Sequence, residues 1–442
     1  MLRARKRTAA AIAILVSGAL LATGCSSSKS STSSNGSSGG SNSADSGQQI
    51  TLKVGLFGTF NYKEGGLYDD YMKLHPNIKI VEDSVEDEGK YYPALLTHLS
   101  AGSGLDDIQG LDVGRIADVT QNLSSKFVDL NGLGAASLKD TFFPAKWAAG
   151  MTSDGKVMGL GTDYGPLAIC YRTDLFQAAG LPTDSAAVSA LWPDWAGYVK
   201  TGLQYKAKAK AGDAFVDTAG GIFNAIVGQS ANQYYDKSGN LIVASNPAVQ
   251  SAWATAMQLS TQGLTAKLSQ FGDAWNKAFT TGSFATIACP AWMTGYIKGQ
   301  AAGASGKWGI ATIPGGTGDW GGSYLAIPKA SKHQKEAYDL ISWLTAPAQQ
   351  EKMFTSQGHF PSSQTAAQDS SVASATDPYF GTSPMGKIFS DSAKGIPDAV
   401  LGPKDGTVKD LISKAITRVE AQGQSPDASW SQLMSDVKSA TS

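Results

Sequence analysis

The sequence has little of what metal centres and the common classes of enzyme require. Its 442 residues include only four histidines, and no two of these have the spacing of a metal-binding pair. It contains neither a Walker-type phosphate loop nor a dinucleotide-binding fingerprint. The formal net charge of −1 gives no excess of basic residues for nucleic acid. We therefore expect no metal, no cofactor and no nucleic-acid partner.

One short match to a catalytic motif is present, but its context argues against catalysis. Residues 36–40 fit the nucleophile-elbow pattern of hydrolases, which needs a strand before the serine and a helix after it. Here the match lies inside residues 26–47, which are almost all Ser, Gly, Asn, Thr and Lys. We interpret it as chance. A carboxylate pair for glycoside hydrolysis stays open, because one sequence does not show how far apart two carboxylates lie.

Long apolar runs are also scarce, and the clearest one lies near the N-terminus. Residues 9–22 are apolar, follow a basic start and are too few for a membrane span of ~20 residues. This order is typical of a secretory signal. The segment 21–25 (Leu-Ala-Thr-Gly-Cys) resembles the lipobox of bacterial lipoproteins, which implies that Cys25 receives diacylglycerol and that residues 1–25 are the signal. The alternative is a free cysteine after an ordinary signal peptide.

The segment that follows the signal is predicted to be a flexible tether. Residues 26–48 are rich in serine and glycine, and a coil of this length reaches ~25–30 Å on average. It would hold the rest of the chain close to the outer face of the cell membrane. That remainder is long for one compact domain and suits two, and the 42% hydrophobic and 17% charged content fits a globular protein.

Cysteine is nearly absent from the mature part of the chain. The two that remain, Cys170 and Cys289, each lie in an apolar run typical of a strand. In an extracellular compartment they could form a disulfide. Two buried free thiols are the alternative. The sequence alone does not decide between these states.

From residue 50 onward the pattern alternates between strands and helices. Residues 50–57, 78–81 and 107–111 read as strands, and the helix at 67–74 ends before Pro76. Strands that alternate with helices indicate an α/β fold with parallel pairing. Ligands of such sheets bind beyond the carboxyl ends of the strands. Residues 57–61 and Asp112 are therefore expected on one rim.

Aromatic residues are abundant, with 10 Trp, 15 Tyr and 15 Phe. Several lie in or near loops beside glycine or proline, namely Phe60, Tyr164, Trp292, Trp320 and Tyr324. A flat ring in such a place suits stacking on the apolar face of a sugar, while Asp and Asn bind its hydroxyl groups. The alternative for any one ring is a place in the core. For the set, we favour a binding function.

The order and spacing of several stretches resemble one known family. Residues 168–176 with 179–181, 274–292, 321–327 and 358–361 carry the resemblance. They are similar to stretches of the extracellular solute-binding lipoproteins of ABC sugar importers, the group that includes maltose-binding protein. The resemblance covers nearly all of the chain after Gln49.

The resemblance implies a type II periplasmic-binding-protein-like fold with two α/β lobes joined by a hinge. Lobe one is expected at 49–163 plus 320–371, and lobe two at 164–319 plus 377–442. Sugar would bind in the cleft between the lobes, which close on it. The implied partners are an oligosaccharide, the transmembrane subunits of an ABC permease, and the membrane through the lipid anchor. The protein is expected to be a monomer and not an enzyme.

The same resemblance places the binding residues. Trp292 matches the family's stacking tryptophan in a Gly-x-Trp motif, although Pro290 stands where that glycine would be. Trp275 is a weaker candidate, because a place in the core of a helix is about as well supported. The full predicted set is Phe57, Gly58, Phe60, Asn61, Asp112, Tyr164, Trp275, Trp292, Trp320, Gly321, Gly322 and Tyr324.

The predicted ligand is a neutral sugar of two or three rings. The candidate loops carry no cluster of Arg or Lys, which a carboxylate or phosphate ligand would need. Taken as a whole, the chain is similar to the actinobacterial cello-oligosaccharide binders, which implies cellobiose or cellotriose. The alternatives are a maltose-, xylo- or chito-type oligosaccharide, or a tethered carbohydrate-active enzyme.

Overall fold

A computed structural model describes residues 48–441 of the chain. The predicted signal segment, the lipid-attachment residue Cys25 and the tether up to residue 47 lie outside the described residues. Within residues 48–441, no helix combines the length and the hydrophobicity that crossing a membrane requires.

The first sheet has five strands in the order β2-β1-β3-β10-β4. Strands β1, β2 and β3 are parallel, and β10 runs antiparallel to both β3 and β4. The bounds of these strands are β1 Ile50–Phe57, β2 Ile78–Val85, β3 Ile108–Asp112, β4 Leu160–Gly161 and β10 Ser323–Ala326. The helices and 3-10 turns around them are α1 Leu67–Leu74, α2 Glu88–Ala101, α3 Val113–Gln121, η1 Ser124–Lys126, η2 Leu130–Leu133, η3 Ala135–Thr141, α4 Pro144–Ala149 and α12 Gln334–Leu344.

Helix caps fix where the carboxyl edge of this sheet ends. Asp87 accepts a hydrogen bond from the Gly89 amide at 2.9 Å and so begins α2. Asp112 does the same for α3 by accepting from the Gly114 amide at 2.8 Å. Each cap satisfies an amide that the first turn of a helix leaves without a partner. Both carboxylates are thereby held at the rim where the sequence predicted a ligand.

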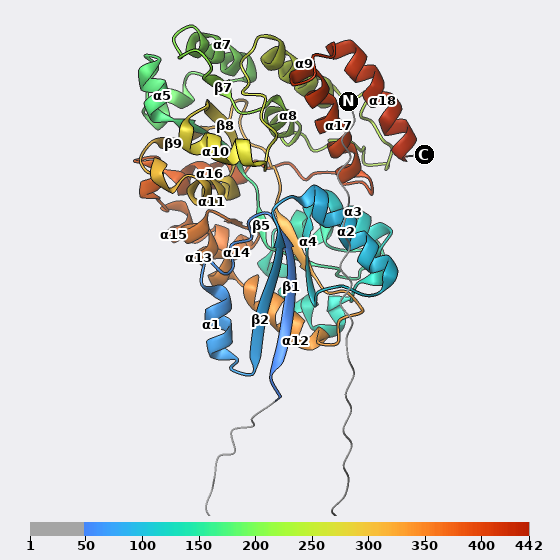
Figure 1. The fold of residues 1–442 in the computed structure, drawn as a ribbon. Coiled ribbons are helices and arrows are strands. Elements are labelled where there is room, and N and C mark those ends of the chain that lie inside the picture. The colour runs from blue at the N-terminus through green and yellow to red at the C-terminus, as the bar shows by residue number, and fades with distance from the viewer. Residues whose placement is uncertain (1–47, 442) are drawn as a thin grey trace, which may run out of the picture. The chain divides into compact units, whose positions relative to one another are not determined.

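The second sheet has four strands in the order β7-β8-β6-β9. Strand β6 is antiparallel to β8 and β9, and β7 is parallel to β8. The bounds are β6 Leu167–Arg172, β7 Ala214–Val216, β8 Phe284–Pro290 and β9 Trp308–Thr312. The helices that follow and surround these strands are α5 Thr173–Ala178, α6 Ser185–Ser189, α7 Trp195–Lys206, α8 Ala219–Val227, α9 Pro247–Thr261, α10 Asp273–Thr281, α11 Ala291–Gln300 and η4 Ala302–Ala304. Figure 1 shows them above the first sheet.

The remaining elements belong to the C-terminal part of the chain. They are α13 Pro347–Gln357, β11 Phe360–Pro361, α14 Gln364–Ala367, α15 Ser370–Ala373, η5 Pro378–Phe380, α16 Met385–Ala393, α17 Asp405–Glu420 and α18 Pro426–Thr441. Strand β11 pairs with β5, which spans Asp163–Tyr164. Helices α17 and α18 lie beside α8 and α9, far from them in sequence (Figure 1).

Two segments of the chain run side by side where it passes between the sheets. Asp319 Oδ1 accepts from the Gly165 amide at 2.9 Å, and the Trp320 amide donates to the Gly165 carbonyl at 2.9 Å. A Cβ on Gly165 would lie 2.0 Å from the Trp320 carbonyl oxygen, so this close approach requires glycine. These paired segments form the hinge region. The exact lobe boundaries stay a prediction.

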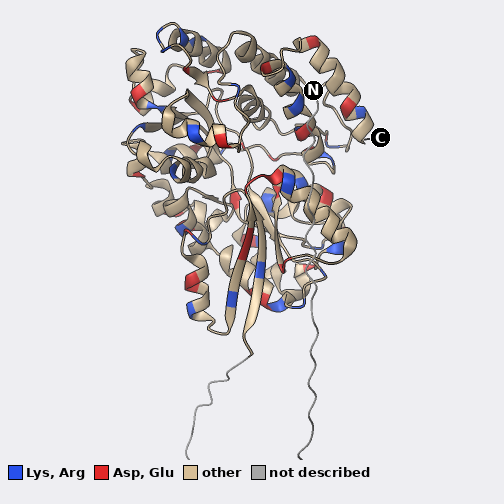
Figure 2. Cartoon of the chain, viewed as in Figure 1, with Lys and Arg blue, Asp and Glu red and all other residues tan. Residues whose placement is uncertain are grey.

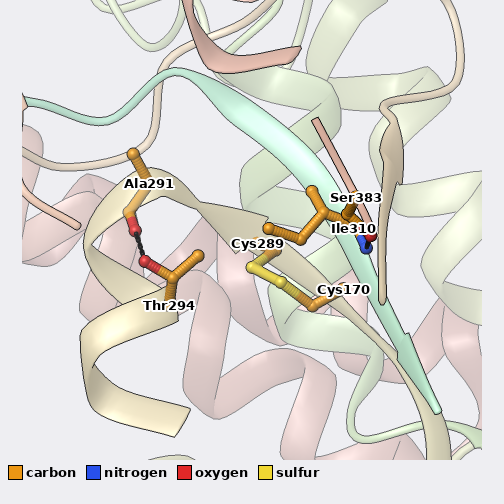
Figure 3. The surroundings of a disulfide bond; sticks show 6 residues. All are labelled: Cys170, Cys289, Ala291, Thr294, Ile310 and Ser383. Atoms are coloured by element: carbon orange, nitrogen blue, oxygen red, sulfur yellow. Dashed lines mark hydrogen bonds between the residues drawn. A yellow bond between two sulfur atoms is a disulfide. The ribbon is translucent and has the colours of Figure 1, made fainter. Parts of the chain in front are cut away.

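Cys170 and Cys289 form a disulfide between β6 and β8, so of the two states left open by the sequence the structure has the bridge. Their Cα atoms are 5.4 Å apart, and both side chains are fully buried. Figure 3 shows the bridge between the two strands, with Ser383 nearby, whose hydroxyl accepts from the Ile310 amide at 2.9 Å. The bridge therefore lies inside the core of the second sheet and away from solvent.

Candidate functional site

A cavity of about 380 Å³ lies between the carboxyl edge of the first sheet and the elements of the second. This volume falls within the range of ligand pockets, ~300–1,000 Å³. The cavity is lined by the loop after β1, the start of α2, the hinge region, helices α8 and α17, the loop 268–271 and the start of α11.

Eight of the twelve predicted binding residues line this cavity. They are Phe57, Gly58, Phe60, Asp112, Trp292, Trp320, Gly321 and Gly322. They come from four parts of the chain, namely residues 57–60, Asp112, Trp292 and residues 320–322, and the fold brings them together at one place. Their contact with a ligand stays a prediction.

The other four predicted residues lie outside the lining. Trp275 is fully buried, and its indole donates to Asp217 Oδ2 at 2.8 Å. Tyr324 is 1% exposed, and its hydroxyl donates to the Lys146 carbonyl at 3.1 Å. Both rings therefore pack behind the cavity wall, where a ligand cannot reach them in this conformation.

Asn61 and Tyr164 are half-buried and also lie outside the lining. Asn61 adopts a left-handed backbone conformation with φ 55°, and its carbonyl accepts from the Gly65 amide at 2.8 Å. The ring of Tyr164 packs edge-on against Phe143, with the centroids 5.4 Å apart. Asn61 therefore shapes the loop after β1, and Tyr164 anchors the hinge strand β5.

Trp292 is positioned by the end of β8 and by the hinge. Pro290 ends the strand and precedes α11, whose second residue is Trp292. The indole N–H donates to the Trp320 carbonyl at 2.9 Å, and the two indoles meet edge to face with centroids 6.1 Å apart. A Cβ on Gly321, which has φ 98°, would lie 2.8 Å from the Trp292 ring nitrogen. With its polar edge satisfied, the half-buried ring presents apolar surface to the cavity.

One wall of the cavity, the loop 268–271, was not predicted from the sequence. Phe271 is half-buried, lines the cavity and precedes Gly272. It therefore has the glycine-flanked aromatic pattern that singled out Trp320 and Tyr324. That signal was therefore present in the sequence, although Phe271 was not among the predicted residues.

Asp217 anchors this loop from the core. Its Oδ2 accepts from Gln270 Nε2 at 2.9 Å and from the Trp275 indole at 2.8 Å, and the residue is fully buried. Burial raises the pKa of Asp217 to about 7, although the hydrogen bonds from Gln270 and Trp275 act in the opposite direction. The loop is thus tied to a carboxyl group that titrates near neutral pH.

Charged residues at the cavity are mainly acidic, and its arginine is already paired. The lining includes six acidic residues (Glu86, Asp87, Glu88, Asp112, Asp163 and Asp410) against two basic ones, Arg115 and Lys409. Arg115 donates to both oxygens of Glu88 at 3.0 and 3.1 Å and to Asp410 at 2.9 Å. Acidic and basic residues are otherwise mixed over the visible face (Figure 2). The cavity is therefore poorly suited to an anionic ligand.

The hinge holds a buried group of titratable residues. The Lys146 ammonium is buried and has no hydrogen-bond partner within the described residues, and burial lowers its pKa. Burial raises the pKa of Asp319 to about 7. His359 lines the cavity, with its Nδ1 3.8 Å from an oxygen of Asp163. Among residues 48–441, no group of three or more His, Cys, Asp or Glu side chains is placed to hold a metal ion.

Comparison with known proteins matches this chain to one family. The model of a family described as bacterial extracellular solute-binding proteins matches residues 66–381. A lactose-binding protein of Rhizobium radiobacter is 26% identical over 348 residues, covering 73% of this chain and 80% of that protein.

Solved structures give the same result. A crystal structure of an extracellular solute-binding protein of family 1 is 40% identical, covers 89% of this chain and 100% of its own, and has a TM-score of 0.74. An ABC transporter associated binding protein from B. animalis subsp. lactis Bl-04, in complex with β-1,6-galactobiose, is 20% identical with a TM-score of 0.76, and covers 88% of this chain and 96% of its own. The second likeness shows the fold alone. The predicted two-lobe α/β fold and the predicted family are confirmed.

Proposed function

The chain belongs to the family of bacterial extracellular solute-binding proteins, and we propose from this premise that it captures a neutral oligosaccharide in the 380 Å³ cavity and delivers it to an ABC permease. The family consists of binding proteins that work outside the cell, so the tethered enzyme considered from the sequence has less support.

The observation that carries the proposal is the Trp292 ring on an acidic wall. The Trp292 indole N–H donates to the Trp320 carbonyl. The ring therefore offers an apolar face and no unsatisfied donor. The carboxylates of the lining can accept hydrogen bonds from sugar hydroxyls. An apolar platform beside hydrogen-bond acceptors fits the two kinds of surface that a sugar ring presents.

For the individual sugar, we keep cellobiose or cellotriose as the first choice. The resemblance to cello-oligosaccharide binders supports it. Proteins similar to this chain are named for lactose and β-1,6-galactobiose, so other disaccharides are direct competitors. Maltose-, xylo- and chito-type oligosaccharides complete the set to be tested.

Delivery depends on features outside the cavity. We propose that Cys25 carries a lipid, that residues 26–48 act as a tether at the outer membrane face, and that the protein works as a monomer. The proposed lobes are residues 49–163 with 320–371, and 164–319 with 377–442. The first sheet draws its strands from residues 50–161 and 323–326, which supports this division.

A thermal-shift screen across neutral sugars tests the function. The panel contains cellobiose, cellotriose, maltose, lactose, xylobiose, chitobiose and β-1,6-galactobiose. A ligand at ~100 times its Kd stabilises the folded state by ~2.7 kcal/mol, which is a clear rise in Tm. A reducing-end assay on the same mixtures should show no released sugar. If no sugar raises Tm, or if the chain cleaves one, the proposal is wrong.

A further inference from the structure

A second, smaller cavity adjoins the sugar cavity at the hinge. Its volume is about 60 Å³, and it is bounded by the start of α3, the C-terminal end of α8, the hinge residues 319–321 and the start of α17. Four residues line both cavities, namely Asn224, Trp320, Gly321 and Lys409. These shared residues form the boundary between the two cavities.

The smaller cavity is lined by polar side chains that have few partners in the protein. Its polar residues are Asn224, Gln233, Tyr234, Asp319, Asp405 and Lys409. Within residues 48–441, only the two aspartates among these side chains make a hydrogen bond, each accepting one from a glycine amide. Asp405 is 4% exposed, and its Oδ1 is buried without a hydrogen-bond partner. Because an unpaired buried polar group costs free energy, this cavity favours a polar occupant.

The size of the smaller cavity limits what it can hold. Its volume is about one sixth of that of the sugar cavity, which we propose holds two or three sugar rings. A further ring is therefore too large. A water molecule needs only ~10–15 Å³, so a polar group of two non-hydrogen atoms fits. The exocyclic hydroxymethyl arm of a hexose is such a group, and a pentose lacks it.

The boundary between the cavities lies next to the place proposed for the sugar. A Cβ on Gly321 would lie 2.8 Å from the Trp292 ring nitrogen, so a sugar on this ring lies beside Gly321. Gly321 brings no side chain to the boundary. The side chains of Asn224 and Lys409 have no hydrogen bond or ion pair within the described part of the chain, so both are free to turn aside.

We propose that the smaller cavity is a subsite for the hydroxymethyl arm of one sugar ring, so that the protein selects oligosaccharides of hexoses over those of pentoses. The arm's hydroxyl both donates and accepts hydrogen bonds, and it meets side chains that otherwise lack partners. The inference rests on the proposed function. It adds the class of sugar, because cellobiose and xylobiose differ only in their hydroxymethyl groups.

The test fills the smaller cavity without touching the sugar cavity. Ala399 is half-buried in a loop and lines the smaller cavity but not the larger one, so Ala399→Val and Ala399→Leu fill it by increasing amounts. Ala209→Leu is the matched control, because Ala209 is a half-buried loop residue outside both linings. The two ligands are the hexose disaccharide of the panel that binds most tightly and its analogue without hydroxymethyl groups, which for cellobiose is xylobiose. Calorimetric titration gives both affinities, and thermal melts without sugar show whether each variant is folded.

We expect the wild type to bind the hexose disaccharide about 10- to 100-fold more tightly than its analogue, as for a pocket that recognises one small group. This ratio should fall with Ala399→Val and drop to about 3-fold or less with Ala399→Leu. The affinity for the analogue should change by less than about 3-fold, since the analogue has no arm to place. Ala209→Leu should keep the ratio of the wild type.

Three results would overturn the inference while leaving the proposed function intact. The first is a wild type that binds the analogue as tightly as the hexose disaccharide, or tighter. The second is an Ala399→Leu variant with the ratio of the wild type, which would show that the arm lies elsewhere. The third is an equal loss of affinity for both ligands in Ala399→Leu, which would mean a general effect on the sugar cavity. If no sugar of the panel binds the wild type, the proposed function itself fails and the inference falls with it.

Discussion

Among single residues, Trp292 and Trp195 offer a matched comparison. Both are half-buried, and each indole donates one hydrogen bond, Trp292 to the Trp320 carbonyl at 2.9 Å and Trp195 to Gln229 Oε1 at 2.8 Å. Only Trp292 lines the cavity. Stability and binding can therefore be separated by truncating one ring at a time.

Trp292→Ala should weaken binding of the sugar found in the screen by ~30-fold or more, because truncating a central aromatic anchor typically costs ~2 kcal/mol. Trp195→Ala should leave the Kd within about 2-fold. Both should lower the free energy of unfolding by a similar amount, about 1–3 kcal/mol, since each removes a half-buried ring and one hydrogen bond. Calorimetric titration and thermal melts of the two variants decide this. Equal binding by Trp292→Ala and wild type would place the site elsewhere.

Asp217 gives a prediction for pH. Burial raises its folded-state pKa to about 7 from the ordinary 3.8 of an aspartate, so between these values the folded state holds a proton that the unfolded state has released. Stability from this group is fully present below pH ~4 and is lost as pH rises through ~7. Asp217→Asn resembles the protonated form and does not titrate.

The free energy of unfolding of Asp217→Asn, measured relative to the wild type by denaturant titration, should rise between pH 5 and pH 8. The expected rise is on the order of 2 kcal/mol for a shift of this size. Asp369→Asn serves as control, since Asp369 is exposed and caps a short surface helix. A difference between Asp217→Asn and wild type that stays constant with pH would show that Asp217 is ionised throughout.

Among helices and strands, the local sequence pattern predicted where several elements lie. It did not predict how the strands pair in the sheets. The helix expected at 67–74 is α1, and the first strand expected at 50–57 is β1. The insertion of β10 between β3 and β4 joins residues more than 160 positions apart, and no local periodicity encodes it. Side-chain direction was equally hidden, because Trp275 points from α10 into the core while Phe271, four residues earlier, reaches the cavity.

The disulfide between β6 and β8 closes a loop with a sequence separation of 119 residues. Replacing both cysteines, as in Cys170→Ala with Cys289→Ala, should lower the free energy of unfolding by ~2–5 kcal/mol. Sugar affinity should stay within about 2-fold, because neither cysteine lines the cavity. The wild type should melt lower after reduction, whereas the double variant should be insensitive to the reductant. A wild type whose Tm ignores a reductant that quantitatively frees both thiols would contradict the stabilising role.

For the protein as a unit, polar contacts join the first-sheet elements to those of the second across the cavity. Glu86, between β2 and α2, accepts from Tyr296 at 2.7 Å and from Asn276 at 2.9 Å. Arg115 of α3 donates to Asp410 of α17 at 2.9 Å. These bonds require the two sides to be close, so we expect them to favour a closed form over a more open one, as would any sugar that contacts both sides.

Loss of these contacts should open the sugar-free protein. We expect the double variant Glu86→Ala with Asp410→Ala to have a larger radius of gyration than wild type by small-angle scattering of residues 47–442, which form one compact unit. At saturating sugar the two profiles should coincide. The double variant removes three hydrogen bonds of ~0.5–1.5 kcal/mol each, so the apparent affinity should fall by about 10-fold or more, through the smaller closed population and through the loss of two carboxylates that line the cavity. Asp70→Ala removes an exposed ion pair to Lys352 outside the cavity lining and should change neither the radius of gyration nor the apparent affinity.

Identical scattering profiles for the wild type with and without saturating sugar would mean that binding does not involve closure, and the hinge would then be a static support for the cavity.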